Sequence, residues 1–302
     1  MRVLVAGSRG FVGSALAREL ARAGHSVLGL TRGSPSENEA HWDPSKGELD
    51  LAQLMPIHAV VNLAGESIAG GRWSAQRKER ILKSRTAATG LLASTAAGLN
   101  PKPRVFLSAS AVGYYGDRGD EILTEESPPG RGFLAEVCRQ WEASCAPARS
   151  AGIPVAVLRL GVVLASEGGA LDQMLLPFRR GVGGILGTGK QYMSWITLAD
   201  AVSAMLHLLE GEGVDGAYNL CAPNPVTNAE FARTAARVLR RPAWVRVPGF
   251  VLRLMLGEMA QEMLLSSTRA VPARLLQRGF AFRHPQLEEA LAQMLGRGPH
   301  TG

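Results

Sequence analysis

The stretch that decides the fold reads Arg2-Val3-Leu4-Val5-Ala6-Gly7-Ser8-Arg9-Gly10-Phe11-Val12-Gly13. An apolar strand runs directly into a Gly-x-x-Gly-x-x-Gly turn, and a helix pattern follows. The first glycine permits the tight turn, the second lets the backbone approach a phosphate, and the third allows close packing of helix on strand. In such a turn the helix N-terminus presents free N–H groups to a pyrophosphate. The stretch therefore predicts a Rossmann-type dinucleotide-binding site made by residues 7–13.

Strands and helices alternate through the first half of the chain. The expected strands are 3–6, 26–31, 59–63, 104–108 and 155–159, and the expected helices are 11–23, 74–98 and 133–151. Such alternation is typical of a parallel sheet covered by helices on both faces. We therefore predict an α/β fold with a Rossmann-type doubly wound parallel sheet.

The composition of the sequence changes after Gly161, where a loop-like stretch up to about residue 193 is rich in glycine. We expect an NADP-binding Rossmann domain over residues 1–165. A smaller, mostly helical C-terminal substrate lobe is expected over 166–302, with about 194–222 returning to the sheet.

The amino-acid composition of the chain argues against several classes of protein. A chain of 302 residues with 46% hydrophobic and 20% charged residues can bury a large core. Its three cysteines lack CxxC spacing and its six histidines lie far apart, so neither a disulfide framework nor a metal site is expected. The chain shows no signal-peptide layout, and no apolar run is long enough to cross a bilayer. The expectation is a cytoplasmic protein without a membrane partner.

The net charge of +7 comes mostly from scattered arginines without a basic block. This pattern indicates a diffuse basic surface and no nucleic-acid partner. A surface of that kind would also attract an anionic dinucleotide or an acidic substrate.

The end of the second expected strand indicates which nicotinamide cofactor binds. An NAD site usually has a carboxylate there for the ribose 2′-hydroxyl, but this chain has Thr31-Arg32. A guanidinium forks onto a phosphate, so Arg32, helped by Arg9, favours the 2′-phosphate of NADP(H). The alternative is an exposed, solvated arginine.

Several motifs together resemble a known family. They are Asn62-Leu63-Ala64-Gly65-Glu66, Gly113-Tyr114-Tyr115-Gly116, Leu176-Pro177-Phe178-Arg179 and Gly187-x-Gly189-x-Gln191-Tyr192. With the glycine turn they resemble an atypical, extended short-chain dehydrogenase/reductase. More narrowly, the chain is similar nearly end to end to the epimerase family typified by bacterial YfcH and human SDR39U1.

The resemblance implies a set of cofactor contacts wider than the turn. It implies contacts from Gly7 to Gly13 and from Thr31, Arg32, Leu63, Ala64, Arg80 and Arg85. The residues by themselves support only the turn and Arg32, because Arg80 and Arg85 read as a solvated helix face.

The catalytic residues depart from the pattern of related dehydrogenases, which combine a Ser or Thr hydroxyl with a Tyr-x-x-x-Lys pair. Ser110 matches the hydroxyl position, but the positions of the pair align with Gly132 and Glu136. Tyr114 or Tyr115 could supply a substitute phenol, or both could be packing residues or a wall of the substrate site. Glu136 could bind substrate, or act as a general acid if burial raises its pKa.

Ligands of open parallel sheets lie beyond the carboxyl ends of the strands. We therefore expect residues 177–180 and 187–192 at the substrate rim, where their cations suit an anionic substrate such as a nucleotide sugar, unless they form a mobile surface loop.

Two functions remain open from the sequence. One is an NADP(H)-dependent oxidoreductase or epimerase acting on a small polar substrate. The other is a non-catalytic NADP(H)-binding redox sensor or partner-binding protein, because this scaffold hosts both. Long helices on one sheet face could also pair two subunits into a homodimer.

Overall fold

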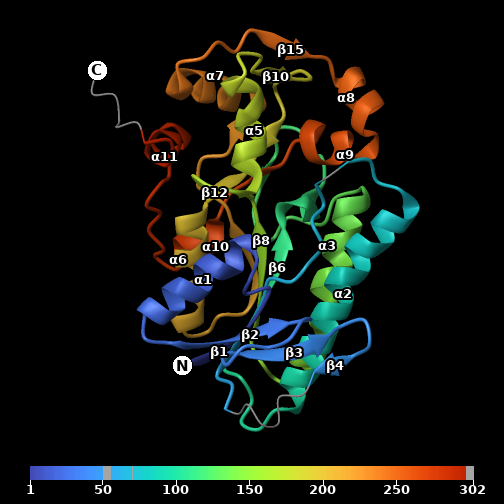
Figure 1. Ribbon diagram of the computed structural model, residues 1–302, viewed down its shortest axis with the longest axis vertical. Coiled ribbons are helices and arrows are strands. Elements are labelled where there is room, and N and C mark those ends of the chain that lie inside the picture. Colours follow the sequence, from blue (N-terminus) through green and yellow to red (C-terminus); the bar gives the residue numbers. More distant parts are fainter. Residues whose placement is uncertain (50–55, 70, 297–302) are drawn as a thin grey trace.

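One large sheet organises the molecule, which a computed structural model describes over residues 1–49, 56–69 and 71–296 (Figure 1). The strand order is β13-β8-β6-β5-β1-β2-β3-β4, and every pairing is parallel except that of β3 with β4. The strands are β1 (Arg2–Ala6), β2 (Ser26–Thr31), β3 (Glu39–Asp43), β4 (Glu48–Leu49), β5 (Ala59–Asn62), β6 (Phe106–Ala111), β8 (Val155–Leu160) and β13 (Gly216–Leu220). The order runs outward in both directions from β1 and β5, which confirms the predicted doubly wound Rossmann-type sheet.

Helices cover both faces of this sheet (Figure 1). One face carries α1 (Phe11–Arg22) and α6 (Leu198–Glu210), and the other carries α2 (Ala75–Gly98), α3 (Phe133–Ala143) and α4 (Ala146–Ser150). Leu16 and Leu20 of α1 pack with Met205 of α6 in one core, while Leu92 of α2 packs with Phe106 in the other. Because the sheet is buried on both faces, its central strands are continuous apolar runs.

A third core lies beyond the carboxyl ends of the strands. It joins Leu175 of α5 (Gly169–Arg179), Phe231 of α7 (Asn228–Leu239) and Leu291 of α11 (Leu287–Met294). The smaller elements of this half are η2 (Val112–Tyr115), β7 (Ile122–Leu123), β9 (Val162–Leu164), β10 (Gly184–Leu186), β11 (Tyr192–Met193), β12 (Trp195–Thr197), β14 (Val226–Thr227), β15 (Val245–Val247), α8 (Gly249–Leu256), α9 (Glu258–Ala260), η3 (Gln261–Leu265), β16 (Arg269–Ala270) and α10 (Ala273–Gln277). The expected domain boundary near residue 165 stays a prediction, and residues 297–302 of the expected lobe lie outside the described residues.

A buried carboxylate ties the end of the chain to the sheet. Asp200 in the first turn of α6 is fully buried, and its oxygens accept from the backbone N–H groups of Arg283 and His284 and from the hydroxyl of Thr197. The first core therefore includes Phe280, which the chain brings back against α6 just before this tie.

Two elements differ from the sequence-based expectation. Residues 169–179, expected to be loop, form α5, because the crowded glycines flank the helix and lie largely outside it. The strand β3 was not predicted, since its sequence Glu39-Ala40-His41-Trp42-Asp43 is largely polar. Only Ala40 and Trp42 of this strand are buried, as expected for a half-buried strand close to a sheet edge.

No helix in the described ranges is long and apolar enough to cross a bilayer. Within those same ranges, no cluster of three or more histidine, cysteine, aspartate or glutamate side chains could hold a metal ion.

Candidate functional site

The glycine turn has the geometry that its sequence predicts. Gly7 has a φ of 80°, and a Cβ there would lie 2.9 Å from the carbonyl oxygen of Leu63. A Cβ on Gly13 would lie 2.0 Å from the carbonyl oxygen of Gly7, so no other residue fits. Gly10 caps α1 without a side-chain hydrogen bond, which leaves the N–H groups of the first turn open to a ligand.

A buried amide fixes the loop beside the turn. Asn62, at the end of β5, donates from Nδ2 to the hydroxyl of Thr89 at 2.7 Å, and its Oδ1 accepts from the backbone of Ala64 at 3.1 Å. The backbone of Leu63 also donates to Ala6 at 2.9 Å. The structure thus brings Leu63 and Ala64 against the glycine turn, as the family resemblance implies for a shared cofactor surface.

A carboxylate that sequence reasoning missed holds Arg9 at the mouth of the turn. Glu39 of β3 accepts from Nε of Arg9 at 2.7 Å and from its Nη2 at 2.5 Å, and it also accepts from Ser36. Hydrogen bonds from Arg9 and then from Ser36 lower the pKa of Glu39 to about 2, so it is ionised at neutral pH. The Arg9 side chain remains 61% exposed, so one edge of its guanidinium can still reach an anion.

Arg32, expected near the 2′-phosphate, and Thr31, implied as a cofactor contact by the family resemblance, lie at or just after the end of β2. Thr31 is buried, and its hydroxyl accepts from the backbone of Gly33 at 3.2 Å, which shapes the turn that follows. Arg32 is exposed. Ser8 lies beside Gly29 of β2, where a Cβ would come within 2.6 Å of the serine hydroxyl. Residues of the turn and of the β2 end therefore share one edge of the sheet.

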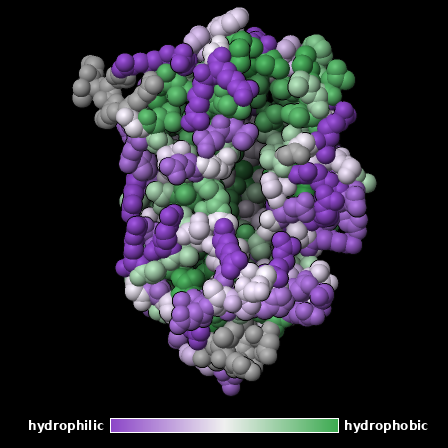
Figure 2. All heavy atoms as spheres, viewed as in Figure 1, coloured by the Kyte–Doolittle hydropathy of each residue, from purple (hydrophilic) through white to green (hydrophobic). Residues whose placement is uncertain are grey.

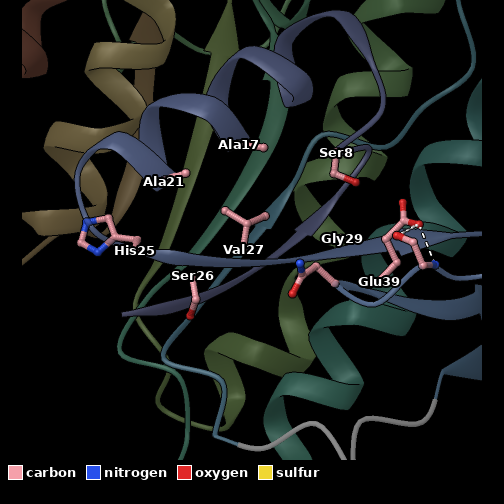
Figure 3. Close-up of a pocket in the computed structure, with 10 residues that line it drawn as sticks. Ser8, Ala17, Ala21, His25, Ser26, Val27, Gly29 and Glu39 are labelled. Carbon is pink, nitrogen blue, oxygen red and sulfur yellow. Dashed lines mark hydrogen bonds between the residues drawn. The ribbon is translucent and has the colours of Figure 1, made fainter.

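A groove of about 450 Å³ runs along β2 beside α1, and Ser8 is the one residue of the glycine turn among those that line it (Figure 3). Its lining mixes small apolar side chains with the polar Ser26, Asn38 and His25, and its one carboxylate, Glu39, is bonded to Arg9 and Ser36. Because it lies largely away from the turn and carries a carboxylate that an anionic ligand would not approach, we do not assign the dinucleotide site to this groove.

The two arginines of α2 have different surroundings. Arg80 is half exposed and forms an ion pair with Glu66 at 3.4 Å. Arg85 lies over the ring of Trp141 at 5.0 Å and against Gly65, and no ion pair to a carboxylate is found for it in the described ranges. Burial lowers the pKa of Arg85, since a cation is costly in a poorly solvated place. An anionic ligand beside the 63–65 loop would supply the missing charge.

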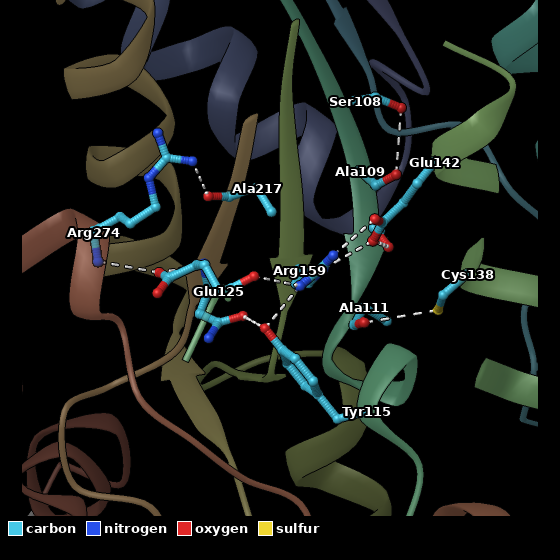
Figure 4. Close-up of polar contacts among 12 residues, drawn as sticks. Ser108, Ala109, Ala111, Tyr115, Glu125, Cys138, Glu142, Arg159, Ala217 and Arg274 are labelled. Atoms are coloured by element: carbon cyan, nitrogen blue, oxygen red, sulfur yellow. Dashed lines mark hydrogen bonds and ion pairs between the residues drawn. The ribbon is translucent and has the colours of Figure 1, made fainter. Parts of the chain in front are cut away.

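A buried polar network occupies the space beneath α3 (Figure 4). Arg159 of β8 forks onto Glu142 of α3 with two contacts of 2.9 Å, and the hydroxyl of Ser110 donates to the same carboxylate at 2.8 Å. Arg159 also donates to the phenol of Tyr115 at 2.9 Å, which in turn donates to Asn219 at 2.7 Å. Burial opposes the charge of Arg159, but the pairing with Glu142 raises its pKa overall.

The network engages the hydroxyls of Ser110 and Tyr115. Ser110 is only 2% exposed and Tyr115 is fully buried, and both hydroxyls are engaged. Burial raises the pKa of Tyr115 to about 12, which suits a neutral framework phenol. Tyr114 is half buried, and the guanidinium of Arg159 lies 3.5 Å from its ring centre. Of the three expected groups, only Tyr114 can meet a ligand without this network being opened.

A second missed carboxylate stands at the N-terminus of α3. Glu262 of η3 accepts from the backbone N–H groups of Phe133 and Leu134 at 3.0 Å each. Gly132, with a φ of 109°, leaves room for it, since a Cβ there would lie 2.3 Å from Glu262 Oε1. A tyrosine at position 132 is therefore excluded while Glu262 holds this place.

Glu136 does not behave as a general acid. Its side chain is 43% exposed, and hydrogen bonds from Arg139 and then Gln140 lower its pKa. The sequence-based alternative of a pKa raised by burial is wrong, because the side chain points to solvent and pairs with a cation.

The expected substrate rim is only partly free. Phe178 is buried in the third core and Arg179 pairs with Asp172 at 3.3 Å. Gln191 is buried and donates to the carbonyl groups of Leu186 and Leu264. These contacts show a packed framework at the expected rim, with Arg180 and Lys190 exposed at its border.

The fold and the turn define a Rossmann-type dinucleotide-binding protein. The chain belongs to the NAD dependent epimerase/dehydratase family, whose model matches residues 3–221, and residues 247–294 match a domain of unknown function, DUF1731. The resemblance to the short-chain dehydrogenase/reductase epimerases is thereby confirmed.

Individual relatives cover almost the whole chain. Epimerase family protein ML0860 of Mycobacterium leprae is 42% identical over 96% of this chain and 94% of its own length. A crystal structure of human SDR39U1 (isoform 2) with NADPH has a TM-score of 0.89 at 34% identity, covering 98% of this chain and 99% of that one. A nucleoside-diphosphate sugar epimerase from Corynebacterium glutamicum has a TM-score of 0.83 at 37% identity, covering 98% of this chain but 58% of that chain.

The ion pair under α3 leads to a stability prediction. Glu142→Gln removes the charge partner of the buried Arg159 and should lower the free energy of unfolding by about 3 kcal/mol. Glu136→Gln, on the same helix but in an exposed pair, should cost less than about 1 kcal/mol. Urea denaturation measures both, and equal losses would contradict the assignment.

The buried phenol leads to a prediction for alkaline pH. Because the pKa of Tyr115 is about 12 in the folded protein and about 10 in an unfolded chain, the folded state holds this proton more tightly. The stabilisation is complete below pH 10 and is lost as the pH rises from 10 through 12. Denaturation followed over this range should show the loss, and Tyr115→Phe should reduce its slope. An unchanged slope would disprove the claim.

Proposed function

We propose that this chain is an NADP(H)-dependent oxidoreductase or epimerase of the short-chain dehydrogenase/reductase type, acting on a small polar substrate. The observation that carries the proposal is the glycine turn, where Gly13 lies too close to Gly7 for any side chain and the α1 N-terminus has no side-chain cap. A pyrophosphate fits this cradle through backbone N–H groups and the helix dipole.

The cofactor preference rests on the cations at the β2 end. Arg9, held by Glu39, and the exposed Arg32 would bind the adenosine 2′-phosphate, while Leu63, Ala64 and Arg85 border the cofactor from the β5 side. The human relative crystallised with NADPH supports the choice of NADP(H). Bound NADP(H) supplies or accepts a hydride, and the protein has to supply the proton at the reacting oxygen.

Tyr114 is the group we propose for that proton. It follows β6 directly, and its ring is held by the guanidinium of Arg159. Ser110 and Tyr115 would act through the network that positions Arg159, so their effect on turnover would be indirect. The substrate would be a nucleoside-diphosphate sugar, an anion suited to a basic chain, as the name of the Corynebacterium relative suggests.

One observation supports the alternative of a non-catalytic NADP(H)-binding protein. Gly132 and Glu136 stand at the positions of the usual tyrosine and lysine pair, and Glu262 fills the space beside Gly132. A non-catalytic NADP(H)-binding redox sensor would need no such pair.

Cofactor binding is tested by titration calorimetry with NADPH and NADH. The wild-type protein should bind NADPH more tightly, and Arg9→Ala and Arg32→Ala should each weaken NADPH binding by roughly tenfold or more while leaving NADH unchanged. Gly13→Ala should abolish binding of both, since its Cβ meets the carbonyl oxygen of Gly7. Arg22→Ala, an exposed arginine at the far end of α1, is the matched control. Tighter binding of NADH to the wild type would refute the NADP(H) assignment.

Measuring turnover distinguishes an enzyme from a non-catalytic redox sensor. Oxidation of NADPH is followed with carbonyl compounds, and nucleotide sugars are screened for epimerisation. With any substrate found, Tyr114→Phe should lower kcat by about 100-fold with unchanged NADPH affinity, whereas Tyr192→Phe should not. Full activity of Tyr114→Phe would remove this residue from the chemistry, and bound cofactor without any turnover would favour the sensor.

A further inference from the structure

Large apolar side chains are exposed together at one end of the molecule. Trp244 is 74% exposed, Phe250 66%, Leu254 75%, Met255 64% and Val182 53%. They come from the residue before β15, from α8 and from the loop before β10, which lie at the upper end in Figure 1. Figure 2 shows hydrophobic atoms gathered over this end. We call these five residues the apolar tip.

Local structure explains why they point outward. The half-buried Val245 and Val247 of β15 alternate with the exposed Arg246 and with Trp244, which directly precedes the strand, as extended side chains do. In α8 only Leu252 is buried, and Phe250 and Leu254, four residues apart, share the outer face. The exposed face of α8 is therefore largely apolar, where a surface helix normally carries polar residues.

The segment of the chain that carries most of the tip also carries uncompensated positive charge. No acidic residue occurs between Glu230 and Glu258, a segment that includes Arg240, Arg241 and Arg246. These three arginines are exposed, and no ion pair joins them to a carboxylate in the part of the chain that the structure describes. Arg253 of α8 donates to the neutral amide oxygen of Gln261, and among the described residues no ion pair joins it to a carboxylate. The tip is therefore both apolar and basic.

We propose that the apolar tip docks peripherally on an anionic lipid surface. Leu254, Phe250 and Met255 would enter the acyl boundary, Trp244 would lie at headgroup level, and the arginines would contact lipid phosphates. The attraction between the arginines and anionic lipids adds to the burial of the apolar side chains.

Charge argues against a second copy as the occupant. A symmetric contact through this tip would bring the arginines of both copies together without acidic partners, and like charges across an interface are unfavourable. The tip also projects at the end of the long axis (Figure 1), which suits entry into a soft bilayer more than the capture of a peptide in a groove.

The proposal departs from the sequence-based expectation of no membrane partner, which rested on the absence of an apolar run long enough to cross a bilayer. No described helix can cross one, so the contact would be at the surface only.

Vesicle sedimentation at low salt tests the proposal. The wild-type protein should bind vesicles of phosphatidylcholine and phosphatidylglycerol at about 3:1, should bind vesicles of pure phosphatidylcholine at least about tenfold more weakly, and should be released by added salt. Phe250→Ser/Leu254→Ser and, separately, Arg240→Ser/Arg241→Ser should each lower binding by about tenfold or more. Circular dichroism checks that the variants fold, as expected for substitutions at exposed positions.

The matched control variants replace the same number of apolar side chains or arginines at exposed positions away from the tip. Ile122→Ser/Leu276→Ser changes two side chains that are 57% and 48% exposed away from the tip, and Arg18→Ser/Arg22→Ser removes the same charge from α1. Both should bind vesicles as the wild type does. No binding to anionic vesicles, equal binding to neutral ones, or losses as large in the controls would overturn the proposal. A lipid-free dimer that Phe250→Ser/Leu254→Ser dissociates would also overturn it, in favour of a second copy.

Discussion

The close contact between the backbones of Gly7 and Gly13 is the constraint on which the nucleotide half depends. A Cβ at position 13 would lie only 2.0 Å from the carbonyl oxygen of Gly7. Because Gly13 has no Cβ, α1 can begin directly against the end of β1. Gly7 of the same turn also packs against the carbonyl group of Leu63, so β1, α1 and the loop after β5 form one continuous surface. Backbone N–H groups can face a pyrophosphate there because no side chain intervenes.

The other half of the site depends on a buried ion pair. Arg159 and Glu142 are both largely buried, and removing such charges from water is costly unless each is fully bonded. The hydroxyls of Ser110 and Tyr115 and the amide of Asn219 supply those bonds or continue the network. Ser110 and Tyr115, which the sequence suggested as catalytic, thus belong to a buried network, whereas Tyr114 is only half buried.

Local pattern was enough to predict the turn, the main strands and the doubly wound sheet, because glycine spacing and apolar runs are determined by neighbouring residues. It could not predict Glu39 or Glu262, whose partners lie 30 and about 129 residues away. A carboxylate in a polar strand or in a C-terminal helix has no sequence signal for such a pairing. The helix α5 was missed for a related reason, since glycines that flank a helix and glycines of a loop look alike in the sequence.

The meeting of Gly132 with Glu262 joins the two family segments of the chain. Gly132 lies within the part that matches the epimerase/dehydratase family, and Glu262 lies within the part that matches DUF1731. Because a Cβ at 132 would lie 2.3 Å from Glu262 Oε1, a tyrosine there and this carboxylate exclude one another. The missing tyrosine and the docked C-terminal segment are therefore two aspects of one arrangement. Any chemistry in this chain has to be built around an anion bound to the first N–H groups of α3, where related enzymes begin their Tyr-x-x-x-Lys pair.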